Sequence, residues 1–125
     1  MTLQAHCIAK VGDKVYVTGG WTEGTRKLTN VYIYDFSQFP TTVTGPEIGP
    51  SLNLGRDFHA CGTLANGAII VAGGDSTEGR TNKVEILLPG STSWVTRKCC
   101  SMLMSSHFDF EFMAFSSKNS KSSCL

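Results

Sequence analysis

The sequence lacks the features that mark several large classes of protein. Its eleven Lys and Arg residues lie among ten Asp and Glu residues and occur at most in pairs, with a net charge of +1. This pattern provides no basic stripe for nucleic acid. No window approaches the roughly 18 apolar residues of a membrane span. The opening residues, Met1 to Gln4, lack the charged start and apolar core of a signal peptide. We therefore expect neither a nucleic-acid partner nor a membrane partner.

Cysteine and histidine are present, but not at the spacing of a metal or redox site. The five cysteines include no Cys-x-x-Cys pair, and no Asn-x-Ser/Thr glycosylation signal occurs. Cys7 and Cys61 are expected at equivalent strand positions as small, buried apolar side chains. A reducing compartment such as the cytoplasm is therefore favoured. No catalytic, cofactor-binding or metal-binding residue is predicted.

A strand would place the side chains of His59 and Cys61 on the same face of the sheet. Such a pair could serve as metal ligands or as a nucleophile with its base. No third ligand or carboxylate lies at a useful spacing. We therefore expect the His59 imidazole to bond backbone between neighbouring structural units.

The chain does contain a repeat with a period of 54 residues. The segment Val15 to Gly20 and the segment Ile69 to Gly74 are both short apolar runs closed by two glycines. Each is preceded by a cysteine and a turn, and each is followed by a polar loop and a second apolar segment. Repeats of this length indicate stacked units that bury their faces against one another.

Alternation of apolar and polar residues predicts strands, and no stretch shows the 3.6-residue period of a helix. The Gly-Pro pairs from Gly45 to Pro50 are expected to be a connection between the two copies. The expected strands are residues 3–10, 14–18 and 31–36 in the first copy, and 58–64, 68–72, 83–88 and 93–97 in the second.

The second copy resembles a kelch repeat. It has an Arg and His-Ala opening (Arg56, His59), the Gly-Gly strand, a Val84-Glu85 strand and a Trp that opens the last strand (Trp94). Leu87 and Leu88 replace the usual Tyr-Asp, and the first copy lacks both the closing Trp and the Arg before His6. The resemblance covers residues 3–98, and its structural markers are Gly19, Gly20, Gly73, Gly74 and Trp94.

The resemblance implies an all-β fold: two four-stranded antiparallel kelch-type blades of an incomplete β-propeller, with a non-repeat C-terminal tail. The expected units are blade 1 at 1–50, blade 2 at 51–98 and a terminal part at 99–125. That part contains a degenerate strand at about 107–115, marked by Phe108, Phe110 and Phe112, and a disordered Ser/Lys tail. Two blades leave outer faces uncovered, so we expect a fragment or truncated form of a longer propeller.

The same resemblance implies a noncatalytic scaffold that presents loops between strands to a protein partner. Such loops gather on one rim of a propeller, which makes Trp21, Arg26, Lys27 and Arg80 the candidate partner-binding residues. The alternative for Trp21 is that its ring folds back on the blade edge.

Two other functions remain open at this point. The chain could be a fragment of a kelch-propeller enzyme, similar to galactose oxidase or to sugar-acid epimerases. The copper version would need a Tyr crosslinked to a Cys and two His ligands. The chain could also have no independent function and self-associate through open blade edges.

Overall fold

The computed structural model describes residues 2–98 of the chain, which form two four-stranded antiparallel sheets and a small third sheet. The first sheet is a meander in which each strand pairs with the next along the chain. Its strands are β1 (Cys7–Val11), β2 (Lys14–Thr18), β3 (Val31–Asp35) and β4 (Thr44–Ile48). The predicted bounds of β2 are confirmed, and β3 ends one residue earlier than predicted.

The second sheet repeats this plan. Its order of strands along the chain is interrupted by the small third sheet. The strands of the second sheet are β6 (Ala60–Thr63), β7 (Ile69–Ala72), β10 (Lys83–Leu87) and β11 (Val95–Lys98). No helix occurs among residues 2–98, so the all-β prediction of two antiparallel blades is confirmed. The terminal part expected at 99–125, with its degenerate strand, lies outside the described residues.

The third sheet was not predicted. It consists of β5 (Arg56–Asp57), β8 (Asp75–Ser76) and β9 (Gly79–Arg80), and each strand is two residues long. Such short strands carry no alternation from which to recognise them. An equivalent hairpin in the first repeat is marked by bridges between Gln4 and Trp21 and between Thr22 and Thr25.

Residues 45–50 were predicted to connect the blades. This prediction is wrong for residues 45–48, which belong to β4. Gly45 and Pro46 lie within this strand. Proline cannot donate a hydrogen bond to a neighbouring strand, but β4 is an edge strand that pairs with β3 alone, so one side needs no donors. A shift of register between Ile33 and Asp35 accommodates the irregular strand.

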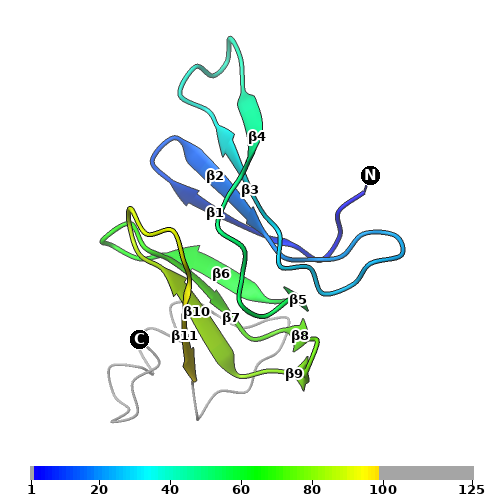
Figure 1. The fold of residues 1–125 in the computed structure, drawn as a ribbon. Coiled ribbons are helices and arrows are strands. Elements are labelled where there is room, and N and C mark those ends of the chain that lie inside the picture. The colour runs from blue at the N-terminus through cyan, green and yellow to red at the C-terminus, as the bar shows by residue number, and fades with distance from the viewer. Residues whose placement is uncertain (1, 99–125) are drawn as a thin grey trace.

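The two sheets form a wedge. The first strands, β1 and β6, lie side by side, whereas the last strands, β4 and β11, lie at opposite outer ends (Figure 1). An apolar cluster fills the space between the sheets. It consists of Ala9, Val31, Leu52, Ile69, Val71, Leu87 and Trp94, flanked by Val11, Tyr16 and Cys61. Trp94 is 4% exposed within this cluster, and its indole donates to the Pro50 carbonyl over 2.7 Å.

The two repeats differ by one residue in their first hairpin. Lys10 pairs with Val15 across four intervening residues, whereas Thr63 pairs with Ile69 across five. Side chains alternate between the faces of a strand, so one extra residue turns every side chain of β6 to the opposite face. Cys7 therefore corresponds in the sheet to Ala60 and not to Cys61, because Cys7 is opposite Thr18 and Ala60 is opposite the matching Ala72.

Among residues 2–98 there is no helix of sufficient length and apolar character to span a lipid bilayer.

Candidate partner-binding rim

The loop that follows β2 is held in a defined shape by its own backbone. The N–H groups of Gln4 and Trp21 each donate to the carbonyl of the other over 2.8 Å. Thr22 and Thr25 exchange a second pair of bonds, and Gly24 takes a positive φ of 85° at the turn between them. Trp21 thus sits at the base of a short hairpin. The loop between β2 and β3, which contains this hairpin, lies at the end of the molecule where β5, β8 and β9 also lie (Figure 1).

Trp21 and Arg26 form one unit with a buried acid from the second repeat. The Arg26 guanidinium carbon is 5.5 Å from the centre of the Trp21 ring, within the range of a cation–π contact. The same guanidinium donates from Nη2 to Asp57 Oδ2 over 3.1 Å. Asp57 is fully buried, whereas the Arg26 side chain is 57% exposed. Arg26 is therefore fixed on one side and open to solvent on the other.

A second ion pair joins the two repeats at the same rim. Lys27 Nζ lies 3.5 Å from Asp75 Oδ2, and both side chains are partly exposed. Asp75 also lies opposite Arg80 in the antiparallel pairing of β8 with β9. The structure therefore brings Trp21, Arg26 and Lys27 together and places Arg80 on the neighbouring loop. We call this surface, made of Trp21, Arg26, Lys27, Asp75 and Arg80, the rim surface.

A hollow of about 630 Å³ lies beside the rim surface. Trp21 provides its aromatic wall, and the other lining residues are polar: Thr2, Gln4, Thr22 and Glu23. Trp21 therefore borders an open hollow on the protein surface.

The double glycines let the rim approach the strands beneath it. A Cβ on Gly19 would lie 2.6 Å from the Arg56 carbonyl oxygen, and one on Gly74 would lie 2.5 Å from the Asp57 carbonyl oxygen. Both glycines also have positive φ, of 59° and 85° respectively. Any side chain would force these backbones apart. Gly19 and Gly74 therefore allow the close backbone contacts at the rim.

Beneath the rim, Arg56 and Glu85 form a fully buried ion pair. Arg56 Nη2 donates to Glu85 Oε2 over 2.9 Å, and both side chains are 0% exposed. Arg56 Nη1 also donates to the carbonyls of Gly73 and Lys83, and the Glu85 carboxylate accepts the N–H groups of Asn53 and Leu54. Burial lowers the pKa of the Arg56 guanidinium, and the Glu85 carboxylate acts against that effect. The pair therefore fixes Asn53 and Leu54, which lie in the segment that joins the two blades, onto the second sheet.

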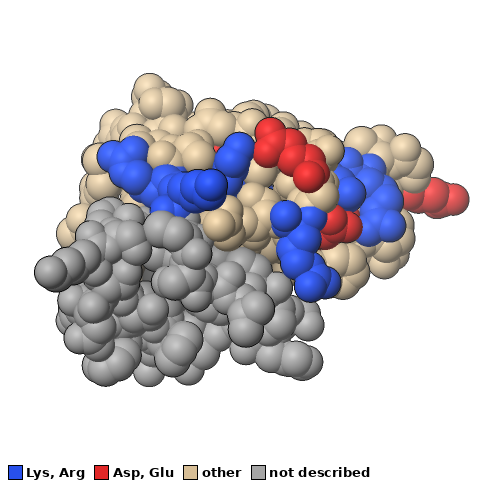
Figure 2. Space-filling view, turned by 90° about the horizontal axis from the view of Figure 1, so that it is seen from below, with Lys and Arg blue, Asp and Glu red and all other residues tan. Residues whose placement is uncertain are grey.

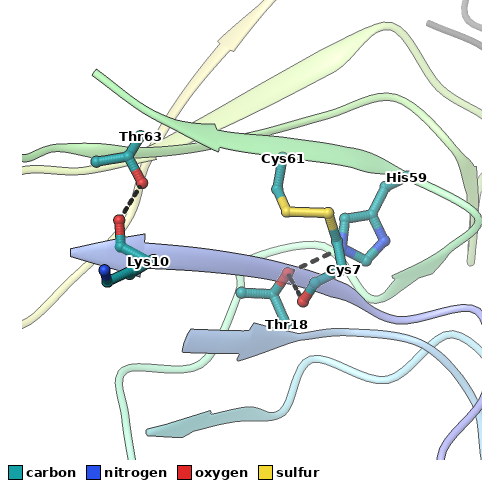
Figure 3. The surroundings of a disulfide bond; sticks show 6 residues. All are labelled: Cys7, Lys10, Thr18, His59, Cys61 and Thr63. Carbon is teal, nitrogen blue, oxygen red and sulfur yellow. Dashed lines mark hydrogen bonds between the residues drawn. A yellow bond between two sulfur atoms is a disulfide. The ribbon is translucent and has the colours of Figure 1, made fainter. Parts of the chain in front are cut away.

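The strands β1 and β6 are joined by a disulfide between Cys7 and Cys61 (Figure 3). This corrects the prediction that both are small, buried apolar side chains at equivalent positions, and with it the argument for a reducing compartment loses its basis. Equivalent residues of stacked repeats point the same way and cannot meet. The extra residue in the second hairpin turns Cys61 toward β1, so the two Cα atoms lie 6.0 Å apart.

His59 also crosses between the sheets, but its partner is a side chain and not the predicted backbone group. Its Nε2 lies 2.9 Å from the Thr18 hydroxyl oxygen (Figure 3). That hydroxyl can donate to the Cys7 carbonyl, at 3.5 Å, which favours the neutral tautomer with the proton on Nε2. Farther along β1, the Thr63 hydroxyl donates to the Lys10 carbonyl over 2.7 Å.

His59 is held neutral by its surroundings. Burial, together with the positive charge of Arg56 and the nearby His6 side chain, lowers the pKa of His59 to about 3. The imidazole therefore serves as a structural hydrogen-bond donor to Thr18.

Charges of both signs are interspersed on the face shown in Figure 2, where Lys and Arg form several separate groups with Asp and Glu between them. The rim surface follows the same pattern, because Arg26 and Lys27 each face a carboxylate.

Sequence reasoning missed two acids of this site, Asp75 in the rim surface and the buried Asp57 beneath it. Each follows a landmark of the repeat: Asp57 comes directly after Arg56, and Asp75 directly after Gly73-Gly74. The adjacency of Asp75 to the double glycine was a usable signal, since Trp21 holds the matching position in the first copy. Nothing in the sequence pairs either acid with Arg26 or Lys27, because that contact depends on how the blades stack.

Comparisons with known proteins bear on the family and on the fold. Residues 4–38 match the Kelch motif. No curated protein sequence matches the chain. Among solved structures, the chain is similar to a fungal alcohol oxidase of the AA5 family that was determined in complex with copper. The TM-score is 0.57 at 19% sequence identity, over 76% of this chain. This chain spans 18% of the length of that oxidase, and the likeness concerns the fold alone.

The described residues do not fit a copper centre. Among residues 2–98, no group of three or more His, Cys, Asp or Glu side chains is placed to hold a metal ion. Cys7 and Cys61 are bonded to each other, so neither sulfur is free for a crosslink to tyrosine. The described strands thus share the fold of that oxidase without a matching donor set.

Proposed function

Because this chain carries a kelch motif and folds as two kelch-type blades, we propose that it is a noncatalytic interaction scaffold whose rim surface binds a protein partner. The rim surface combines an aromatic ring with a partly exposed guanidinium, and both groups are fixed in place before binding. Trp and Arg are the residue types most enriched where interfaces concentrate their binding energy. A rigid anchor loses little conformational entropy when it binds.

The observation that carries this proposal is the contact of Arg26 with both Trp21 and Asp57. An exposed arginine would normally sample many rotamers. Here the buried carboxylate and the indole restrain it, while more than half of its side chain stays accessible to a partner. The alternative of a kelch-enzyme fragment has no comparable set of residues in its favour within the part of the chain that the structure describes.

The test compares partner recovery by the wild type and three variants of the full chain. Trp21→Ala and Arg26→Ala alter the rim surface. Phe39→Ala is the matched control, because Phe39 is also an aromatic residue at 65% exposure but lies in the loop between β3 and β4, at the opposite end of the sheet. Proteins retained by each immobilised variant would be compared by quantitative mass spectrometry.

We expect proteins that bind the wild type and Phe39→Ala to be reduced at least tenfold for Trp21→Ala, consistent with losing about 2 kcal/mol at an interface anchor. Circular dichroism should show unchanged strand content in all variants. Equal recovery by Trp21→Ala, Arg26→Ala and Phe39→Ala would show that the rim surface is not the binding site.

A further inference from the structure

The Cys7–Cys61 disulfide crosses the seam between the blades at the place where β1 and β6 meet. It joins residues 54 positions apart and therefore encloses all of the first blade after Cys7. Both cysteines are half-buried, so a reductant can approach the bridge from solvent. Accessible disulfides of this kind are the ones open to thiol exchange.

Two side-chain hydrogen bonds also cross this seam, the Thr18–His59 bond and the bond from the Thr63 hydroxyl to the Lys10 carbonyl. The apolar cluster packs beside the bridge: it includes Ala9 of β1 and extends past Cys61 into the second sheet. Loss of the disulfide should therefore loosen β1 against β6 without separating the blades.

The rim surface depends on the same alignment. Arg26 and Lys27 belong to the first repeat, whereas their carboxylate partners, Asp57 and Asp75, belong to the second. A shift of one blade against the other that separates these charges would lengthen the ion pairs and release Arg26 from its fixed position beside Trp21.

We propose that Cys7 and Cys61 act as a reversible redox clamp that sets how rigidly the two blades, and with them the rim surface, are held together. In the oxidised state β1 is fixed against β6. In the reduced state the blades remain packed through the apolar cluster, but the seam opens more often. The consequence for partner binding rests on the proposed function, whereas the clamp itself does not.

The redox step is a two-electron thiol–disulfide exchange with a dithiol. One thiolate of the dithiol attacks one sulfur of the bridge, the Cys7–Cys61 bond breaks, and the other cysteine leaves as a thiolate that takes up a proton. The second thiol of the dithiol then attacks the dithiol sulfur of the mixed disulfide, which closes the dithiol's own disulfide and releases the remaining protein cysteine as a thiolate that takes up a proton. Cys7 and Cys61 end as two thiols, and the dithiol ends as a disulfide.

The test uses the full chain in which Cys99, Cys100 and Cys124 are replaced by Ser, so that no other cysteine can exchange with the bridge. Peptide mapping after differential alkylation would identify the bonded pair. Hydrogen exchange of the amides in β1 and β6 would then be measured in the oxidised protein, after dithiothreitol treatment, and in a Cys7→Ser/Cys61→Ser variant.

We expect mapping to recover Cys7 bonded to Cys61, and reduction to speed exchange in β1 and β6 by about tenfold or more. The double variant should resemble the reduced protein and should not respond to dithiothreitol. Two free thiols in the air-oxidised protein, or exchange that is unchanged by reduction, would overturn the clamp. A clamp that is confirmed while Trp21→Ala leaves partner recovery unchanged would overturn the proposed function alone.

Discussion

At the scale of single residues, burial separates the ion pairs that determine the fold from those that shape the surface. Arg56 and Glu85 are both fully buried and hydrogen-bonded to backbone as well as to each other. Lys83 and Glu78 form a pair of similar length, 3.0 Å, but their side chains are 39% and 61% exposed. Solvent screens the second pair, whereas loss of one partner from the first leaves an isolated buried charge.

Replacement of Arg56 by methionine should therefore lower the free energy of unfolding by about 3–5 kcal/mol, since the Glu85 carboxylate would stay buried without its cation. Lys83→Met is the matched control and should change stability by less than about 1 kcal/mol. Urea denaturation followed by fluorescence would measure both. If Arg56→Met fails to fold, Glu85→Gln provides the same comparison, and equal effects of the buried and exposed substitutions would contradict this assignment.

His59 predicts a pH dependence of stability. Its pKa is lowered to about 3 in the folded protein, mainly by burial, from an ordinary value of 6.5. Between these values the unfolded chain binds a proton that the folded protein excludes. The free energy of unfolding should therefore fall as the pH drops from about 6.5 toward 3, by up to about 1.4 kcal/mol per pH unit.

The matched variant is His59→Gln, whose amide can still donate to the Thr18 hydroxyl but does not titrate. Chemical denaturation at pH 7, 6, 5 and 4 should give a shallower decline for this variant than for the wild type. Parallel declines would mean that His59 is not the group responsible.

At the scale of elements, the length of one hairpin decides which residues meet between the blades. The segment from Leu64 to Ala68 is one residue longer than its counterpart, Val11 to Lys14. That difference alone turns Cys61 and Thr63 toward β1, where they reach Cys7 and Lys10. The 54-residue spacing of the double glycines does not reveal this difference, because the extra residue lies in the turn between β6 and β7.

The elements that the sequence predicted well are those whose pattern is local. The bounds of β2 follow from its alternation and from the glycines that end it. By contrast, β4 was missed because an edge strand tolerates the Gly-Pro residues that elsewhere mark turns. The candidate residues at the rim gather because they follow equivalent glycines, but their pairing with Asp57 and Asp75 depends on contacts between repeats, which no local pattern records.

Moving the second cysteine by one position along β6 tests this register. In the double variant Ala60→Cys/Cys61→Ala the thiol lies opposite Ala72 and therefore on the other face of the sheet, so the disulfide to Cys7 should no longer form. Non-reducing peptide mapping would detect its loss, while Ala60→Ser, which leaves Cys61 in place, should retain it. Recovery of Cys7 bonded to position 60 in the double variant would contradict this account of the register.

At the scale of the whole molecule, the wedge has an uncovered outer face on its first blade. Residues of β1 alternate between the two sides: Cys7 and Ala9 face the second blade, and Ile8 points away with 57% of its surface exposed. The edge strand β4 adds Ile48, which is 68% exposed. In a complete propeller a neighbouring blade would cover this face, and an uncovered apolar surface favours association.

We therefore expect the chain to self-associate through the face that carries Ile8, as a function of concentration. Ile8→Lys should shift the population toward monomer in light scattering coupled to size exclusion, because a charged side chain cannot be buried there without a partner. Leu88→Lys is the control, since Leu88 is 48% exposed but lies at the turn after β10 of the second blade. A wild type that is monomeric at every concentration would contradict self-association. An equal shift from both variants would show that the association does not depend on this face. Because the same measurement reports whether the two-blade wedge is stable as a single copy, it also determines whether partner binding at the rim surface must be studied on a monomer or on an assembly.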